Sequence, residues 1–247
     1  MGDVRVGVRV ERGPVGPVVR PPDATDLVVL YLHGDRRLLA GSPESALDLA
    51  ERLALRTDAV VLCPRYRTSF PAALDDVHAV YETCLAQGSR VVVAGERLGA
   101  GLAAALLVRL RDMGAVQPQC ALLNSALLDL TLQAPSLMLN AAADAGFDLT
   151  ELRLRAGHYA AGADPVNPLL SPLHANLHGL VPLQLLVAGT DPLLDDSLGF
   201  AERAARSGVT VDLRVRADAG ALLPELVPAM ADFIQVWAPA GQPARPA

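Results

Sequence analysis

The chain contains no lysine, so arginine supplies all 21 of its basic residues. The arginines are scattered along the sequence, and 27 acidic residues bring the formal net charge to −6. This pattern excludes the clustered basic surface of a nucleic-acid-binding protein. Aromatic residues make up only 4% of the chain, so its core has to be built from Leu, Val and Ala. A hydrophobic fraction of 51% is enough for one globular domain with a sizeable core.

Cysteine is also scarce. The three cysteines, Cys63, Cys84 and Cys120, form neither a disulfide framework nor a metal-binding spacing. We therefore expect reduced thiols, a cytoplasmic protein and no metal or other cofactor. The N-terminal residues lack the apolar core of a signal peptide, and no apolar run approaches the roughly 18 residues of a membrane span. We expect no membrane partner either.

Short apolar runs alternate with segments of helical periodicity, which favours an α/β fold with a mostly parallel central sheet and helices on both faces. A single domain is expected over residues 1–238, with a cap insertion at about 128–178 and a disordered tail at 239–247. The predicted strands are 4–10, 15–20, 26–32, 59–63, 91–94, 120–123, 183–188 and 211–215. The predicted helices are about 14 residues after Ser42, then 72–87, 99–113, 197–207 and 224–237, with a mostly helical stretch at 132–161.

One stretch combines a strand, a very tight turn and a helix, and it reads VVVAGERLGAG from Val91 to Gly101. Hydrolases place a nucleophilic serine at the centre of such an elbow, in the pattern G-x-S-x-G. The central residue here is Arg97. Arginine is charged at physiological pH and has no lone pair for attack, so it cannot replace the serine.

Several further motifs connect the chain to a known family. They are YLHG at 31–34, FPAALDD at 70–76, LDLTLQAPS at 128–136 and a stretch at 163–197 that ends in VAGTDPLLDDS. Over about residues 26–235, the chain resembles the α/β-hydrolase fold in its hormone-sensitive-lipase-like branch of bacterial esterases and lactone hydrolases. The resemblance implies an α/β-hydrolase fold, here with a reduced cap.

The resemblance also implies a triad in the order Ser, Asp, His, with an oxyanion loop after the first buried strand. Asp191 matches the acid, whereas the serine position falls on Arg97. The histidine is expected within residues 217–222, but the last histidine of the chain is His178. In the oxyanion loop, His33-Gly34 is followed by Asp35-Arg36 instead of two further glycines. Two triad members are therefore missing, which disfavours hydrolysis through an acyl-enzyme.

Two interpretations of Arg97 remain open. In the structural one, its guanidinium pairs directly with Asp191 in a bidentate manner and fills the volume of the missing histidine. In the functional one, Arg97 clamps a carboxylate or polarises a carbonyl, and Glu96, Asp35 and Asp191 are candidate general bases. The residues predicted to bind the substrate are His33, Gly34, Arg36, Leu98, Tyr66 and Tyr159.

Three functions follow from these interpretations. The leading hypothesis, by analogy, is a non-hydrolytic cyclase, isomerase, epimerase or lyase that acts on a small, largely apolar molecule in bacterial specialised metabolite biosynthesis. The second is an inactive pseudo-esterase that serves as a binding or partner protein. The third is a residual esterase or lactonase that uses a water activated by Asp191 or Glu96. A homodimer built on apolar helices such as 224–237 stays open.

Overall fold

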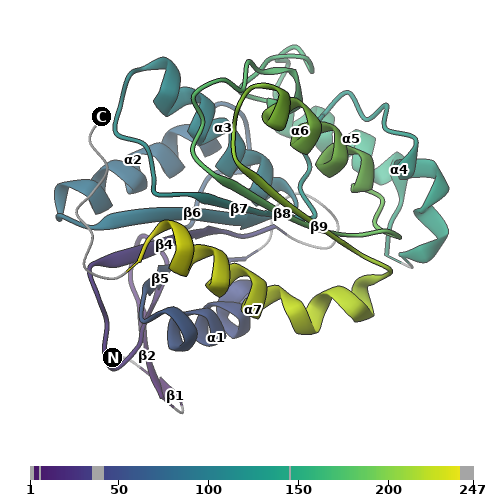
Figure 1. The fold of residues 1–247 in the computed structure, drawn as a ribbon. Coiled ribbons are helices and arrows are strands. Elements are labelled where there is room, and N and C mark those ends of the chain that lie inside the picture. The colour runs from purple at the N-terminus through teal and green to yellow at the C-terminus, as the bar shows by residue number, and fades with distance from the viewer. Residues whose placement is uncertain (1–2, 6, 35–41, 145, 240–247) are drawn as a thin grey trace.

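The computed structural model describes residues 3–5, 7–34, 42–144 and 146–239. Within this part of the chain, nine strands form one sheet in the order β1-β2-β3-β5-β4-β6-β7-β8-β9 (Figure 1). The strands are β1 (Asp3–Arg5), β2 (Val8–Arg12), β3 (Pro17–Arg20), β4 (Leu27–Leu32), β5 (Val60–Leu62), β6 (Arg90–Glu96), β7 (Ala121–Asn124), β8 (Leu183–Ala188) and β9 (Val211–Arg216). In this order, neighbouring strands from β5 across to β9 are parallel. The pairs β1–β2, β2–β3 and β3–β5 are antiparallel.

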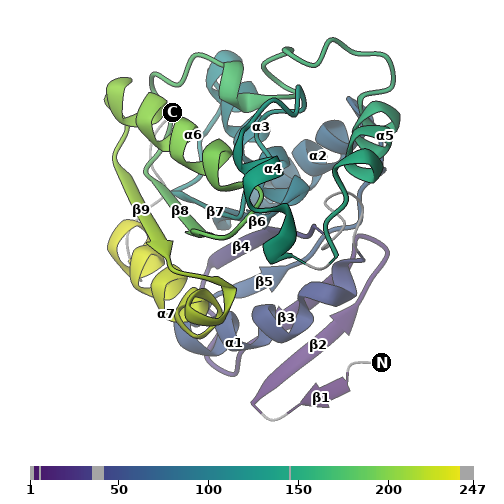
Figure 2. The same ribbon diagram turned by 90° about the vertical axis from the view of Figure 1, so that its right-hand side faces the viewer.

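Helices cover both faces of the sheet, and each face has its own apolar core (Figures 1 and 2). One face carries α1 (Leu47–Thr57) and α7 (Ala219–Trp237), which pack against each other. The other carries α2 (Ala72–Ala86), α3 (Leu98–Asp112) and α6 (Leu194–Arg206). Because both faces are covered, β4, β6 and β8 are apolar throughout nearly their whole length. The mostly parallel, two-sided sheet predicted from the sequence is therefore confirmed.

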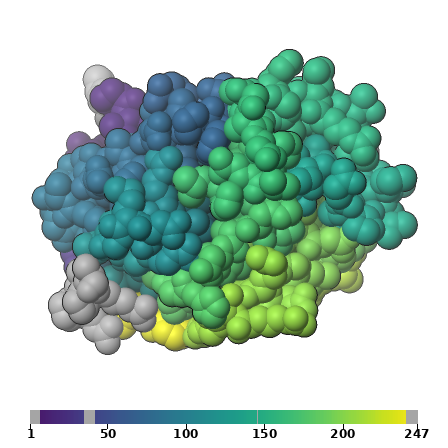
Figure 3. Space-filling view, turned by 90° about the horizontal axis from the view of Figure 1, so that it is seen from above, coloured from purple at the N-terminus to yellow at the C-terminus, as the bar shows by residue number. Residues whose placement is uncertain are grey.

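The predicted cap range, 128–178, holds four short helical elements and connecting loops. They are α4 (Ser136–Leu139), η2 (Ala141–Ala143), α5 (Leu149–Ala160) and η3 (Pro172–His174). Figure 2 shows α4 and α5 on the same side of the sheet as α2, α3 and α6. In the view from above, this segment (green) runs across the middle of the face, between the α2–α3 region and α6 (Figure 3).

The largest differences from the predicted element boundaries occur in two places. Residues 4–10, expected as one strand, belong to the separate strands β1 and β2, and Gly7 between them has a φ of 89° that strand residues do not adopt. Helix α7 begins at Ala219 and not at Pro224, because the Asp218 side chain caps it by accepting the N–H of Ala221 at 2.9 Å. This helix is long and apolar enough to span a membrane by composition, but here it packs against α1 and β8. The tail that was predicted to be disordered lies outside the described residues, except for Pro239.

The elbow between β6 and α3 brings backbone segments unusually close together. Arg97 lies at its tip with φ 55° and ψ −121°, a conformation that costs free energy for any residue with a Cβ. Three backbone hydrogen bonds hold it there: its N–H donates to Asn124, and its carbonyl accepts from Gly101 and Leu127. A Cβ on Gly99 would lie 2.0 Å from the Leu32 carbonyl oxygen. The predicted elbow is thus present, and glycine at position 99 is what lets α3 approach β4.

A buried carboxyl fixes the start of the cap to α6. Asp196 accepts the N–H groups of Leu128 at 2.7 Å and Asp129 at 3.0 Å, and its side chain is almost fully buried. Burial raises the pKa of the Asp196 carboxyl to about 7, even though both N–H donors act in the opposite direction. The segment that leaves β7 for the cap therefore depends on a carboxyl that is protonated more readily than usual.

Replacing Gly99 with alanine is expected to destabilise the protein, since the new Cβ meets rigid backbone. We expect a loss of about 1–3 kcal/mol in the free energy of unfolding, measured by urea denaturation. Gly157→Ala is the matched control, because Gly157 lies within α5 and its added Cβ would meet nothing within 4 Å. That control should gain about 0.5–1 kcal/mol from helix propensity. Equal stability of the two variants would show that the elbow is not closely packed.

The raised pKa of Asp196 predicts a stability that falls as the pH rises. The carboxyl has a higher pKa folded than unfolded, so its protonated form stabilises the fold below about pH 4, and this contribution is lost as the pH rises to about 7. The non-titrating Asp196→Asn variant should lack that loss, and its stability relative to wild type should increase by about 2 kcal/mol or more over this range. Thermal or urea unfolding at pH 4, 5.5 and 7 measures it, with the exposed Asp48→Asn as control. A constant difference would contradict the prediction.

Candidate functional site

The elbow tip opens into a cavity of about 820 Å³ at the carboxyl ends of β6, β7 and β8. Parallel α/β sheets place their ligand sites at this edge. The polar lining comes from Glu96 and Arg97 of the elbow, Asn124 at the end of β7 and Ser125 after it, Thr190 and Asp191 after β8, Asp144 of the cap, and Ser42 and Ser45 at η1 (Pro43–Ala46). Three leucines at the start of α7, Leu222, Leu223 and Leu226, give the cavity an apolar wall.

Arg97 and Asp191 lie together in this cavity. The guanidinium Nη1 donates to Asp191 Oδ1 at 3.2 Å, and Nη2 lies 4.0 Å from Asp144 Oδ2 in the cap. The pair expected from the sequence is therefore present, but it is not bidentate, because the second nitrogen faces Asp144. The pair does not fill the site either, since both residues border an open cavity. Arg97 thus lies between the loop that carries Asp191 and the cap residue Asp144.

The loop that carries Asp191 is fixed by its surroundings. Asp191 Oδ1 also accepts the N–H of Leu193 at 2.9 Å. The amide of Asn140, next to η2, donates to the carbonyls of Gly189 at 3.1 Å and Asp191 at 2.9 Å. Because one carboxylate oxygen already has two donors, Asp191 acts mainly as an anchor for Arg97.

Glu96 is the third acid of the cavity, beside Asp191 and Asp144, and it accepts the N–H of Gly34. Its side chain is half-buried at the end of β6, where burial raises the pKa of its carboxyl. The neighbouring Arg97 charge and the N–H of Gly34 act in the opposite direction. Gly34 is pressed against the elbow, since a Cβ there would lie 2.4 Å from the Glu96 carbonyl oxygen. Glu96 is therefore a carboxylate of raised proton affinity beside a fixed cation, a combination that suits a general base.

Four residues predicted to bind substrate do not line the cavity. His33 is buried and stacks on Tyr66 with ring centroids 4.5 Å apart, and the Tyr66 hydroxyl donates to the His33 carbonyl. Leu98 points into the core between the sheet and α3, because the first turn of the helix packs on the strands. Tyr159 is buried under the cap, where its carbonyl accepts the N–H of Phe70. These side chains support the site without facing it, and Gly34 is the predicted binding residue that does line it.

Two predicted residues, Asp35 and Arg36, lie outside the described residues. Asn124 and Asp144, which were not predicted, border the cavity, as does Ser125, which the sequence places near the site but as a structural residue. Asn124 ends a buried strand and Ser125 follows it, so the strand-end rule for parallel sheets was a usable signal for them. Asp144 had no such signal, because the cap loop carrying it has no regular pattern.

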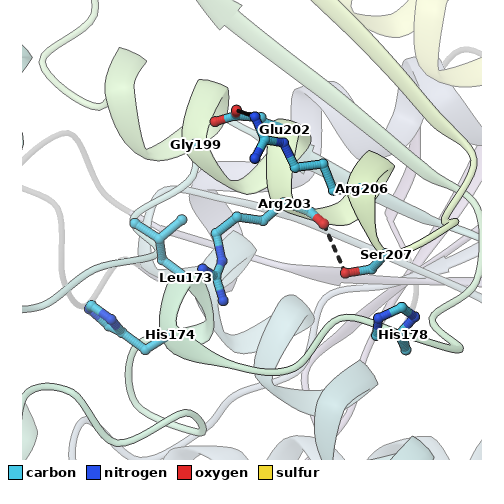
Figure 4. A pocket seen from close by; sticks show the side chains of 8 residues that line it. All are labelled: Leu173, His174, His178, Gly199, Glu202, Arg203, Arg206 and Ser207. Atoms are coloured by element: carbon cyan, nitrogen blue, oxygen red, sulfur yellow. Dashed lines mark hydrogen bonds and ion pairs between the residues drawn. The ribbon is translucent and has the colours of Figure 1, made fainter.

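A second groove of about 660 Å³ lies between α6 and the η3 segment (Figure 4). Its lining includes His174, His178, Arg203 and Arg206. His174 Nε2 lies 3.0 Å from Asp129 Oδ1, and the Arg203 guanidinium donates to the Ala175 carbonyl. Arg206 pairs with Glu202 on the same helix. These side chains mainly tie surface segments together, so the cavity at the elbow is the candidate site.

Comparisons with known proteins agree with this geometry. Residues 29–220 match a family described as alpha/beta hydrolase fold. An acetyl-hydrolase of Streptomyces hygroscopicus is 39% identical over 200 residues, which cover 78% of this chain and 67% of that protein. An esterase of Acinetobacter venetianus is 32% identical over 82% of this chain and 69% of its own length. The crystal structure of an esterase from the bacterial hormone-sensitive lipase family superposes with a TM-score of 0.86 at 32% identity, covering 95% of this chain and 86% of the other.

These comparisons correct the leading functional hypothesis. The matched proteins are an acetyl-hydrolase and esterases, so they point to a hydrolase and not to a cyclase, isomerase or lyase in a biosynthetic pathway. The alternative of an inactive pseudo-esterase is contradicted in the same way. The loss of the serine and the histidine argues against an acyl-enzyme but not against hydrolysis, because Glu96, Asp144 and Asp191 of the same cavity leave other hydrolytic chemistry open.

The Arg97–Asp191 contact is expected to contribute to stability, because both side chains are largely buried, with exposed fractions of 18% and 7%. A double-mutant cycle with Arg97→Gln and Asp191→Asn should give a coupling free energy of about 1–3 kcal/mol by urea denaturation. The exposed Arg206–Glu202 pair is the control and should give about 0.5 kcal/mol or less. Equal couplings for the two pairs would show that Arg97 is not anchored by Asp191.

Proposed function

Because the chain belongs to the α/β-hydrolase family, we propose that it hydrolyses small carboxylic esters with water, and not a serine, as the nucleophile. The relatives named acetyl-hydrolase and esterase support the reaction class. The observation that carries the proposal is the elbow cavity itself, in which Glu96 and Arg97 stand side by side at the tip of the turn. A base and a cation at that point provide the two elements that direct hydrolysis requires.

The proposal includes a triad without its serine and histidine. Arg97 occupies the tip of the elbow, where the pattern G-x-S-x-G would place the nucleophile. The loop between β9 and α7 consists of Ala217 and Asp218, and Ala219 borders the cavity on that side. An arginine cannot form an acyl-enzyme, and no imidazole is present in this loop to accept a proton. In this scheme the attacking group is a water molecule.

Arg97 supplies the electrophilic assistance. An ester carbonyl that enters the cavity meets the Arg97 guanidinium at the start of α3. A second donor within the cavity is not needed for this role, because the guanidinium carries a full positive charge. It stabilises the negative charge that develops on the carbonyl oxygen during attack. Arg97 keeps donors free for this task, since one nitrogen contacts Asp191 and the other lies 4.0 Å from Asp144.

Glu96 is the general base in this scheme. Water attacks the carbonyl carbon while one of its protons passes to the Glu96 carboxylate. The carbonyl π bond opens to an alkoxide beside Arg97. When the alkoxide collapses, the bond to the leaving oxygen breaks and Glu96 returns the proton to that oxygen. The products are a carboxylic acid and an alcohol, and Glu96 is regenerated. Asp191 suits this role less, because Arg97 and the N–H of Leu193 already engage it.

The size and lining of the cavity favour esters with a short acyl group and an apolar alcohol. A volume of about 820 Å³ has to hold both halves of the substrate. The leucines of α7 form an apolar wall, whereas the charged residues gather at the elbow. General-base catalysis contributes about 10²–10⁴-fold, so we expect a slow esterase.

Hydrolysis of p-nitrophenyl acetate tests the proposal. Glu96→Gln should lower kcat about 10²-fold or more, because the amide cannot accept the proton. In the wild type, kcat should rise with pH through the raised pKa of Glu96, since only the carboxylate is active. The exposed Glu202→Gln on α6 is the matched control and should leave the rate unchanged.

Arg97→Ser separates this mechanism from that of a serine esterase. We expect the substitution to lower the rate, because it removes the cation and provides no base for the new hydroxyl. A wild type without turnover above buffer, or a Glu96→Gln variant with full activity, would refute the proposed function.

A further inference from the structure

Directly behind Glu96 lies a group of buried polar side chains that have few partners. The Tyr31 ring is fully buried, and its hydroxyl makes no hydrogen bond to any described residue. The Oδ1 atom of Asn124 is likewise buried without a partner in this part of the chain, and its Nδ2 donates to the Met230 sulfur at 3.5 Å. Buried polar atoms without a partner are rare in native proteins, and two beside one cavity are a signal.

Strand register brings these groups to one place. Glu96 of β6 and Asn124 of β7 are paired residues, so their side chains are neighbours on the same face of the sheet. Tyr31 of β4 pairs with Ala94, two residues before Glu96, and therefore shares that face from the opposite side of β6. All three side chains project toward α1 and α7. Glu96 and Asn124 border the cavity, and Tyr31 lies beneath them.

The charges and dipoles of these neighbours also affect the pKa of Tyr31. Burial, and then the Glu96 carboxylate, raise the pKa of Tyr31, whereas the Asn124 side chain, which lies close to the hydroxyl but outside hydrogen-bonding geometry, lowers it. The Cys63 thiol belongs to the same surroundings, and burial raises its pKa to about 12. Tyr31 is therefore a neutral hydroxyl that can donate, Asn124 Oδ1 is an acceptor, and Glu96 is an acceptor when ionised.

We propose that Tyr31, Asn124 and Glu96 together bind the water molecule that attacks the ester. Tyr31 donates its hydroxyl hydrogen to the water oxygen. The water donates one hydrogen to Asn124 Oδ1 and the other to the Glu96 carboxylate. One lone pair of the water then remains, and it faces the cavity. A buried water is stable with two to four such partners.

This inference rests on the proposed function, and it assigns two positioning residues to it. Tyr31 and Asn124 touch neither the ester nor the oxygen that leaves. They orient the water so that the transfer of its proton to Glu96 and its attack on the carbonyl carbon occur together. Misplacing an attacking group by about 1 Å lowers a rate about 10²-fold, so orientation alone is a measurable contribution.

Tyr31→Phe tests the proposal, since it removes the hydroxyl and keeps the ring. We expect kcat for p-nitrophenyl acetate to fall 10-fold or more with little change in KM, because the substrate does not contact Tyr31. Asn124→Leu should lower kcat by a similar factor. The double variant should have about the same kcat as the less active single variant, because both substitutions disturb the same water. Tyr81→Phe is the matched control: Tyr81 is also fully buried, but its hydroxyl donates to the Val116 carbonyl outside the site. An unchanged kcat in Tyr31→Phe would overturn the proposal.

Two measurements that need no substrate test the water site independently of the proposed function. A crystal structure at about 1.5 Å should show one water within hydrogen-bonding distance of Tyr31 Oη, Asn124 Oδ1 and Glu96. The melting temperature of Tyr31→Phe should equal or fall below that of the wild type, because a hydrated hydroxyl is satisfied. A higher melting temperature would show that the hydroxyl has no partner, and it would overturn the water site whether or not the wild type hydrolyses esters.

Discussion

The close approach of α3 to β4 at Gly99 is the constraint on which the rest of the site depends. Any side chain at that position would collide with the Leu32 carbonyl, so the turn between β6 and α3 can only be this tight with glycine there. The tight turn forces Arg97 into a positive φ and directs its side chain to the carboxyl edge of the sheet. Three backbone hydrogen bonds keep it in that conformation. The position of the guanidinium is therefore set by backbone packing.

Around that fixed cation, the cavity gathers three carboxyl groups with different surroundings. Asp191 is held by Arg97 and by the N–H of Leu193. Asp144 approaches from the cap at 4.0 Å. Glu96 is half-buried, and its pKa is raised. The environments of the carboxyl groups therefore give them different roles, with Asp191 as the anchor of Arg97 and Glu96 as the proposed base. The proposed hydrolysis by water depends on this difference, because the elbow has no serine.

The sequence predicted those features whose cause is local. The elbow, the buried strands and the helix ends depend on neighbouring residues, and most of them lie where they were expected. The Arg97–Asp191 contact came from the family resemblance. Leu98 and Tyr159 were assigned to the cavity wrongly, because proximity in sequence to a site does not fix the direction of a side chain. The place of Asp144 depends on the path of the cap, and the grouping of Tyr31 and Asn124 with Glu96 depends on strand register, neither of which a single sequence determines.

The central claim is that the ester is cleaved without a covalent intermediate, and intact-protein mass spectrometry during turnover tests it most directly. The protein is mixed with excess p-nitrophenyl acetate, quenched in acid at several times, and its mass is compared with the release of p-nitrophenol. We predict steady release of p-nitrophenol with the protein at its unmodified mass throughout. An acetylated species that forms and decays as fast as turnover would contradict the account, as would the absence of any release above buffer.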